Sequence, residues 1–345
     1  MLENSSKTDI SSVGEFGLID LLTSPIQLQH PSTLKGVGDD AAVLRYENGK
    51  VTLVSTDLLL EGVHFDLSYF PLKHLGYKAI TVNLSDIYAM NGTPKQVTVS
   101  LGISSKFSLE AVEEIYAGML LACNRYEVDL IGGDTSSSKQ GLVISITAIG
   151  EADENDVVYR NGAKVNDLLC VTGDLGGAYT GFQLLEREKR VFLANPEIQP
   201  DLEGKDYIIE RQLKPEARKD IIPMLKGLGI KPTAMIDISD GLASEIIHLC
   251  SKSEVGMNLY EDKIPIDPQT YNVAREMDLD PTLTALSGGE DYELLFTIPQ
   301  ADYEKIQNNP DITVIGYVAD KSEGINMISK GGNKHPLKAQ GWKAF

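Results

Sequence analysis

Apolar residues recur along the chain with two different periods, and the two periods alternate from segment to segment. Between Leu109 and Cys123 the apolar side chains return every third or fourth position, which predicts an amphipathic helix. Residues 72–90 show the same period until Gly92-Thr-Pro94 interrupts it. Further helices are expected over 14–22, 206–213 and 216–228, and strands over 96–103, 142–151, 167–172, 294–298 and 312–318. This alternation predicts an α/β (α+β) fold.

Changes in polarity and charge along the sequence also divide the chain into regions. A length of 345 residues fits one very large domain or two ordinary ones. Residues 1–13 are polar and predict a flexible leader. The stretch 151–166 is polar and charged before apolar strands resume, so we expect an N-terminal domain over 14–152 and a C-terminal domain over 153–345. The charged segment 186–205 is expected to form an irregular, mobile loop.

Composition narrows the range of functions. The chain carries 50 acidic and 31 basic residues, and this net charge of −19 argues against nucleic acid or an anionic membrane surface as the main partner. No apolar run approaches membrane-spanning length and the N-terminus shows no signal pattern, so we expect a cytoplasmic protein. The cysteines form no CxxC pair and the histidines lack metal-ligand spacing, so neither a disulfide framework nor a zinc site is supported.

Acidic and hydroxyl side chains gather at the ends of apolar runs. Asp39 and Asp40 precede one such run, and Ser55, Thr56 and Asp57 end the next. Hard oxygen ligands with no neighbouring lysine or arginine are those that Mg²⁺ prefers, usually together with a phosphate. Aspartate and glycine are also ordinary turn residues, so this stretch alone is equally consistent with a turn.

Other acidic positions in the first half repeat this arrangement. Asp86 falls on the apolar side of the 72–90 helix, where a carboxylate is unfavourable unless it is paired or coordinated. Capping of a neighbouring loop is the alternative role. Gly133 and Asp134 end a short strand, where glycine lets backbone N–H groups approach a phosphate; a plain tight turn is the alternative.

The second half of the chain carries two more acidic groups. Asp237, Ser239 and Asp240 end a strand, and Asp240 could be only the N-cap of the next helix, whereas Asp237 has no such role. Glu290 follows Gly-Gly just before another strand. Gathered at one cleft, these acids would hold several Mg²⁺ ions and the phosphates of a nucleotide. The metal charge would reconcile an acidic protein with a polyanionic ligand.

Several other kinds of site find no support in the sequence. It contains no Walker GxxxxGK[ST] pattern and no GxGxxG after a strand, so P-loop and Rossmann sites are not indicated. It also shows no Ser/His/Asp or Cys/His arrangement. Phosphoryl transfer to an acceptor that is already an anionic phosphate needs positioning and charge neutralisation rather than a strong base. The acidic groups therefore favour that chemistry.

The chain resembles the thiamine-monophosphate kinase family in six ordered motifs: GVGDDAA, STDLLLEGVHF, VNLSDIYAMNG, LIGGDT, IDISDGL and LSGGEDYEL. The resemblance covers roughly residue 14 to the C-terminus. It implies the two-domain aminoimidazole ribonucleotide synthetase-like ATP-binding fold, with mixed sheets flanked by helices. It also implies direct in-line transfer from ATP to thiamine monophosphate, the final step of thiamine diphosphate biosynthesis, in a homodimer paired through its N-terminal domains.

By matching position, the resemblance also implies roles for individual residues. The catalytic residues would be Asp57, Asp86 and Asp134. The Mg²⁺ ligands would be Asp40, Ser55, Thr56, Asp57, Asp86, Asp134, Asp237 and Asp240. ATP, the co-substrate, would contact Gly133, Arg160, Ser239 and Tyr116. Thiamine monophosphate would contact His64, Glu290 and Trp342. K⁺ is a further candidate ion, and Asn161 stands where the family more often has serine.

Sister enzymes of the same superfamily are the nearest alternatives. Selenophosphate synthetase would carry a reactive cysteine or selenocysteine near the N-terminus, whereas the first cysteine here is Cys123. The hydrogenase-maturation carbamoyl dehydratase would end in a cysteine tail, whereas this chain ends in Trp-Lys-Ala-Phe345. Aminoimidazole ribonucleotide synthetase would show a lysine-bearing sequence in place of LLLEGVHF. A non-catalytic module that binds divalent cations or nucleotides is the alternative from a different class.

Overall fold

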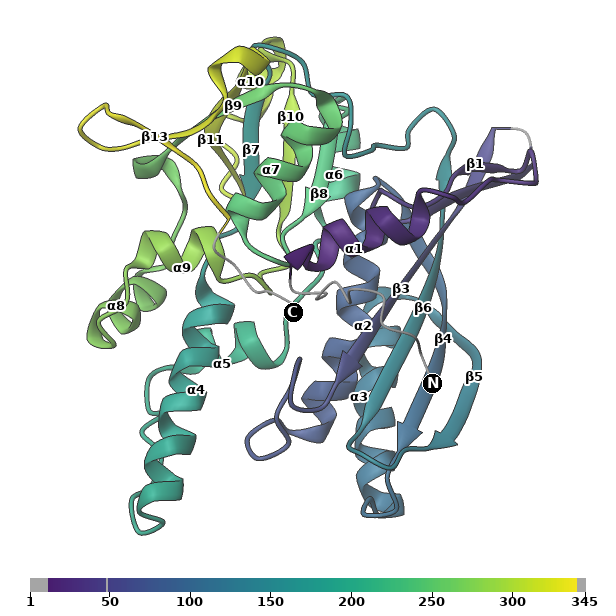
Figure 1. The fold of residues 1–345 in the computed structure, drawn as a ribbon, viewed down its shortest axis with the longest axis vertical. Helices are drawn as coiled ribbons and strands as arrows, with labels where there is room; N and C mark the ends of the chain where they lie inside the picture. Colours follow the sequence, from purple (N-terminus) through teal and green to yellow (C-terminus); the bar gives the residue numbers. More distant parts are fainter. Residues whose placement is uncertain (1–11, 48, 340–345) are drawn as a thin grey trace, which may run out of the picture.

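The structure is a computed structural model that describes residues 12–47 and 49–339 of the chain. Two β-sheets organise these residues, one built from each half of the sequence (Figure 1). Both sheets are mixed and have helices packed against them, so the predicted fold class is confirmed. Most of the expected leader 1–13, and Trp342, lie outside the described residues. Within the described part, no helix is long and apolar enough to cross a membrane.

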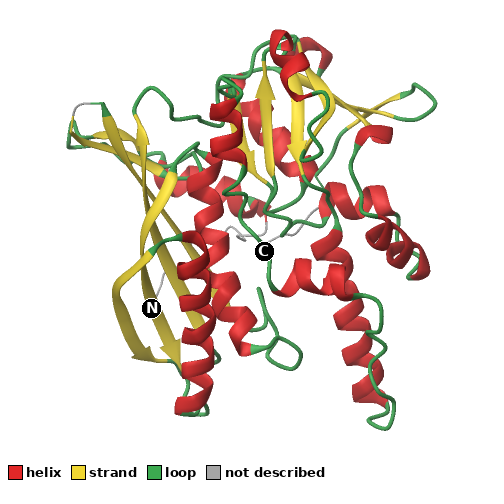
Figure 2. Cartoon of the chain, turned by 180° about the vertical axis from the view of Figure 1, so that it is seen from behind, coloured by secondary structure: helices red, strands yellow, loops and turns green. Residues whose placement is uncertain are grey.

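The first sheet has six strands, β1 to β6. In chain order they span Thr33–Lys35, Ala42–Glu47, Lys50–Leu60, Thr93–Ile103, Asp129–Ser137 and Val143–Asp153. Their spatial order is β1-β2-β3-β6-β4-β5, with β5 added in parallel to β4 at the edge. Helices α2 (Leu72–Ala89) and α3 (Leu109–Tyr126) cover one face. Among the described residues no helix covers the other face, as both overall views show (Figures 1 and 2).

Helix α2 is buried on nearly every side because it lies between the two halves of the molecule. It packs closely on α3 through two glycines. A Cβ atom on Gly76 would lie 1.9 Å from the Ile115 carbonyl oxygen, and one on Gly118 would lie 1.9 Å from the Lys73 carbonyl oxygen. Only glycine allows this approach of two backbones. Helix α2 is thus a closely packed central element, and its contacts with both halves of the molecule fix the positions of its side chains.

The second sheet has seven strands in the order β13-β12-β9-β11-β7-β10-β8. Strands β7 to β13 span Leu168–Thr172, Ala234–Asp237, Gly256–Tyr260, Leu294–Ile298, Ile312–Ala319, Ile325–Ile328 and Lys334–Pro336. The remaining helices, α1 and α4 to α10, span Gly14–Thr23, Gly177–Ala194, Asp206–Leu213, Ile221–Gly227, Leu242–Ser253, Pro268–Glu276, Pro281–Ser287 and Tyr303–Ile306. Strands β7, β8 and β10 are buried almost throughout, as their continuous apolar runs require.

Two expected elements differ from the structure. The prediction of an irregular loop over 186–205 is wrong for its first part, because α4 continues as a helix to Ala194. Leu184, Leu185 and Glu188 give this helix a buried side at helical spacing despite its many charges. The expected helix over 216–228 begins only at Ile221.

Candidate functional site

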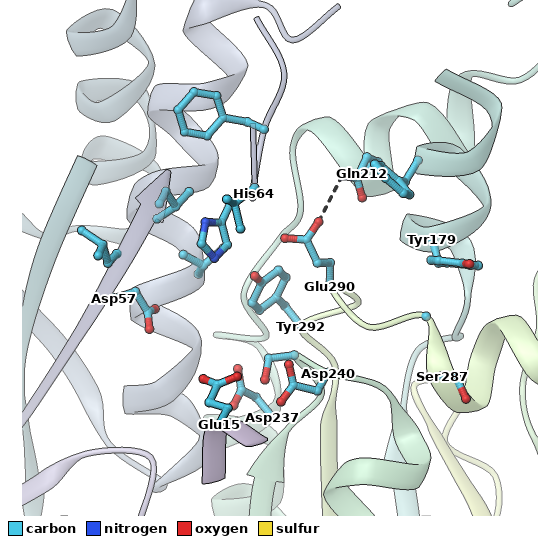
Figure 3. Close-up of a pocket in the computed structure, with 18 of the residues that line it drawn as sticks. Glu15, Asp57, His64, Tyr179, Gln212, Asp237, Asp240, Ser287, Glu290 and Tyr292 are labelled. Atoms are coloured by element: carbon cyan, nitrogen blue, oxygen red, sulfur yellow. Dashed lines mark hydrogen bonds between the residues drawn. The ribbon is translucent and has the colours of Figure 1, made fainter. Parts of the chain in front are cut away.

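A cleft of about 990 Å³ lies between the two halves of the chain. The first half contributes β3, the loop that follows it and one side of α2. The second half contributes the end of β8, the loop before β10 and the first turns of α4. In Figure 3, Asp57 and His64 lie across the cleft from Glu290, and Asp237 and Asp240 lie below.

Three of the predicted metal ligands meet beside this cleft, and two of them, Asp86 and Asp237, line it. Carboxylate oxygens of Asp40, Asp86 and Asp237 lie within 4.8 Å of one another. Asp40 precedes β2, Asp86 belongs to α2 and Asp237 ends β8, so the cluster draws on both halves of the chain. The hydroxyl of Ser55 donates to Asp86, and the hydroxyl of Ser85 donates to Asp237 at 2.6 Å. These bonds fix the direction in which each carboxylate points.

Burial raises the pKa of these carboxyl groups. The pKa of Asp40 rises to about 7, and those of Asp57 and Asp237 rise to about 6. Burial and three neighbouring carboxylates also raise the pKa of Asp86 well above its ordinary value. Among the described residues, Oδ2 of Asp40 is buried with no hydrogen-bond partner. Hard carboxylate oxygens that repel one another, one of them without a hydrogen-bond partner, fit a divalent cation such as Mg²⁺.

Arg160 is the cation that the structure places beside this cluster. Its guanidinium donates to Oδ1 of Asp40 from Nη2 at 2.7 Å and from Nε at 3.2 Å. Its backbone N–H donates to Asp39 at 2.9 Å, and Asp39 also pairs with Lys35 at 3.3 Å. Asp39 therefore anchors the backbone of Arg160, while the Arg160 side chain lines the cleft and can face a phosphate.

The loop after β8 presents Ser239 and Asp240 to the cleft. The backbone N–H groups of both residues donate to Oε1 of Glu245, at 3.0 and 2.8 Å. The N-cap of α7 is Gly241, so Asp240 does not serve as the cap. Burial raises the pKa of Asp240 to about 6. Sequence reasoning missed Glu245, which is fully buried and holds this loop in place.

His64 and Glu290 face each other across the cleft, above Asp237 and Asp240 in Figure 3. The backbone N–H of Leu60 donates to Nδ1 of His64 at 3.0 Å. The neutral imidazole therefore carries its proton on Nε2. Burial lowers the pKa of His64, which keeps the ring neutral at physiological pH.

The Gly-Gly-Glu-Asp-Tyr-Glu motif presents its acids in different directions. Glu290 lines the cleft. Asp291 is buried and accepts from backbone N–H groups at the start of α4. Glu293 is buried between Arg211 and Arg218, at 2.9 and 2.6 Å. Asp291 and Glu293 therefore hold the second half together, and only the first acid of the motif faces the cleft.

A single chain does not bring Asp134 to the acidic cluster. Asp57 on β3 is paired with Ile146 on β6, which is paired with Val99 on β4, which in turn is paired with Gly133 on β5. Three strand spacings therefore separate Asp57 from Gly133. At about 4.8 Å per strand, Gly133 lies roughly 14 Å from Asp57. Asp57 faces the helix-covered side, as do the buried Ile146 and Val99, whereas Asp134 is the next residue along β5 and faces the open side.

The structure also shows the contacts of three other predicted site residues, Thr56, Tyr116 and Gly133. Thr56 alternates with Asp57 along β3, and its hydroxyl donates to the Ile146 carbonyl at 2.9 Å at the rim of the cleft. Tyr116, on α3, packs half-buried against the core of the first half, apart from the described cleft lining. A Cβ atom on Gly133 would lie 1.7 Å from the Val99 carbonyl oxygen, so packing alone requires glycine there.

Comparison with known proteins identifies the family to which this chain belongs. Residues 38–152 match the family described as AIR synthase related protein, N-terminal domain. The thiamine-monophosphate kinase of Bacillus subtilis (strain 168) is 35% identical over 339 residues, which is 96% of this chain and 99% of that protein. That of Aquifex aeolicus (strain VF5) is 35% identical over 338 residues, 97% of this chain and 99% of that protein. A solved structure, AaThiL complexed with AMPPCP and TMP, is similar with a TM-score of 0.84 at 34% identity, covering 99% of this chain and all of that one (100%). The chain belongs to the thiamine-monophosphate kinase family.

Proposed function

We propose that the protein transfers the γ-phosphoryl group of ATP directly to thiamine monophosphate, forming thiamine diphosphate and ADP. The observation that carries this proposal is the convergence of Asp40, Asp86 and Asp237 beside one cleft, which His64 and Glu290 also line. Acids of this kind suit a metal–nucleotide complex, and the cleft leaves room for an acceptor beside it. The family relatives carry the matching name, and AaThiL binds AMPPCP and TMP.

Mg²⁺ would be held by Asp57, Asp86, Asp237 and Asp240, which line the cleft, and by Asp40, which lies next to Asp86 and Asp237. When bound, it would neutralise the charge on the transferring phosphoryl group and on the leaving ADP. The chain's own contribution is to orient these carboxylates through buried hydroxyl groups and to place the Arg160 guanidinium next to them. Several Mg²⁺ ions would bind together, with K⁺ as a further candidate ion.

His64 would donate a hydrogen bond from Nε2 to the phosphate of thiamine monophosphate. Its Nδ1 already accepts from the Leu60 N–H, so this ring acts as a donor and not as a base. The attacking phosphate oxygen is anionic and needs no proton removed, which agrees with that assignment.

We also propose a homodimer paired through the N-terminal domain, residues 14–152, in which Asp134 completes the partner's site. The open face of the first sheet carries exposed apolar side chains, including Leu58 at 50% exposure and Ile131 at 57%. Asp134 lies on this open side and too far from Asp57 to share a metal within one chain. A second copy packed on this face is the simplest way for Asp134 to reach a cluster. A cytoplasmic location is proposed because the co-substrate is ATP.

The direct test is product analysis. Purified protein is incubated with ATP, Mg²⁺ and either thiamine monophosphate or thiamine, and the products are separated by chromatography. The proposal predicts equal amounts of thiamine diphosphate and ADP with the monophosphate, and no diphosphate with thiamine alone. Nucleotide binding without thiamine diphosphate would instead support a sister enzyme or a non-catalytic binding module.

A further inference from the structure

Lys78 is fully buried beside the cleft, and the reaction outlined above does not use it. We infer that Lys78 is a positioning residue, which fixes the Glu290 carboxylate at the acceptor end of the cleft from the opposite half of the chain. This inference rests on the proposed function, because Glu290 is the residue assigned to thiamine monophosphate.

The surroundings of the Lys78 ammonium group are complete. Nζ donates to Oε2 of Glu290 at 2.8 Å and to the backbone carbonyl of Gln212 at 3.2 Å, and it lies 5.4 Å from the ring centroid of Phe70. Only 1% of the Lys78 side chain is exposed. A buried ammonium group is strongly unfavourable unless it is paired, so Lys78 depends on its ion pair with Glu290.

Lys78 and Gln212 hold the same oxygen of the Glu290 carboxylate. Oε2 of Glu290 accepts from Lys78 and also from Nε2 of Gln212 at 3.0 Å, the bond drawn in Figure 3. The other carboxylate oxygen points away from Gln212 into the cleft (Figure 3). The backbone of Glu290 is in the left-handed region, with φ of +58°, and its N–H donates to the Ser239 carbonyl at 2.7 Å. A non-glycine residue in this conformation is strained, so the neighbouring bonds must hold it.

Helix α2 connects the two ends of the cleft. Lys78, Val82 and Asp86 follow one another at four-residue spacing and so lie on one face of the helix. Lys78 and Asp86 are therefore about 12 Å apart along the axis. Asp86 lies in the acidic cluster, and Lys78 holds the carboxylate of Glu290 at the acceptor end of the cleft. One rigid, buried helix thus sets the separation between the two groups of residues.

The charge of Lys78 has a second consequence for an anionic acceptor. Glu290 alone would repel a phosphate placed nearby, and the adjacent ammonium offsets this repulsion. Loss of Lys78 should therefore weaken binding of the acceptor much more than binding of the nucleotide.

The test uses the full-length protein and two ligands that do not react alone. Calorimetry measures the Kd of thiamine monophosphate and, separately, of Mg²⁺ with the non-hydrolysable nucleotide AMPPCP. Lys78→Met should raise the Kd for thiamine monophosphate about tenfold or more, which is about 1.4 kcal/mol, and change that for AMPPCP less than about twofold. Lys205→Met is the control, because Lys205 is also a largely buried lysine in an ion pair, with Asp201, and lies outside the cleft lining.

A double-variant cycle separates positioning from simple stabilisation. Adding Lys78→Met to Glu290→Gln should have little further effect on the Kd for thiamine monophosphate, because the carboxylate to be positioned is gone. Gln212→Met, a milder change, should raise the same Kd if Lys78→Met does not fold. Unchanged acceptor affinity in these variants, or equal weakening of both ligands, would overturn the inference. Absence of thiamine diphosphate formation by the wild-type protein would instead overturn the proposed function.

Discussion

The hydroxyl of Ser85 donates a hydrogen bond of 2.6 Å to Oδ2 of Asp237. Ser85 is fully buried in α2 and Asp237 ends β8, so this bond joins the two halves of the chain beside the acidic cluster. Asp86 follows Ser85 directly, and its carboxyl group accepts from Ser55 on β3. The cluster is therefore held by three elements that are distant in sequence, and its geometry depends on the whole fold.

Replacement of Asp57 by asparagine should abolish activity while the protein stays folded. The change removes a negative charge from the cleft at nearly constant side-chain volume, and we expect turnover to fall at least about a hundredfold. Burial disfavours the charged form of Asp57, so the metal-free variant should melt at the same or a higher temperature than the wild type near neutral pH. Full turnover by a folded Asp57→Asn protein would refute the assignment.

The stability of the metal-free protein should fall as the pH rises. Burial raises the pKa of Asp40 to about 7 and those of Asp57, Asp237 and Asp240 to about 6. Between about pH 4 and pH 7 the folded state thus binds protons that the unfolded chain has released, so the free energy of unfolding decreases across this window. The melting temperature should be higher near about pH 5.5 than near about pH 8.

Added Mg²⁺ should reverse this trend, because it binds the ionised carboxylates of the folded state. The increase in melting temperature caused by Mg²⁺ should be larger near about pH 8 than near about pH 5.5. Asp57→Asn supplies the control, since it removes one titrating group and should weaken the pH dependence. A melting temperature that rises steadily with pH in chelator-treated protein would contradict this account of the cluster.

Replacement of His64 by alanine should raise the KM for thiamine monophosphate more than the KM for ATP. The variant loses an Nε2 donor on the acceptor side of the cleft and leaves the acidic cluster intact. Loss of one hydrogen bond to a charged group corresponds to about tenfold in KM. His64→Gln retains a side-chain N–H donor and should recover part of the loss. If steady-state kinetics show equal increases for both substrates, the proposed role of His64 is wrong.

Mixing of two inactive variants tests whether Asp134 acts in the partner's site. In a mixed dimer of Asp57→Asn and Asp134→Asn chains, one site would contain both changes and the other site neither. With half of the dimers mixed and one of two sites intact, coexpression should restore about a quarter of wild-type activity. No restoration in a demonstrated mixed dimer would show that both residues act within one chain.

The sequence predicted the structure best where the period of the apolar residues was clear or where acidic residues stood beside an apolar run. The apolar stripe from Leu109 to Cys123 predicted the helix that the structure has as α3. Acids beside apolar runs marked Asp40 and Asp237, and the structure brings their carboxylate oxygens within 4.8 Å of each other. The loop prediction failed over 186–194, because charges on the solvent side of α4 concealed its buried side, which Leu184, Leu185 and Glu188 form.

Other features depend on relationships that no local pattern contains. Lys78 lies on the same face of α2 as Asp86, a spacing that could have marked it, but its partner Glu290 is 212 positions away. The location of Asp134 follows from strand order, because β5 joins the edge beyond β4 and not the strand that carries Asp57. Strand order arises from packing of the whole chain and is not visible in a short motif.

The most direct test of the account follows the γ-phosphate of ATP through a single turnover. Enzyme in excess is mixed with γ-labelled ATP, Mg²⁺ and thiamine monophosphate, and the label is followed in protein, free phosphate and thiamine diphosphate. Direct transfer predicts that the label passes from ATP to the terminal phosphate of thiamine diphosphate while the protein stays unlabelled. A labelled protein that later yields thiamine diphosphate would contradict direct transfer, and label found only in free phosphate would contradict the kinase itself.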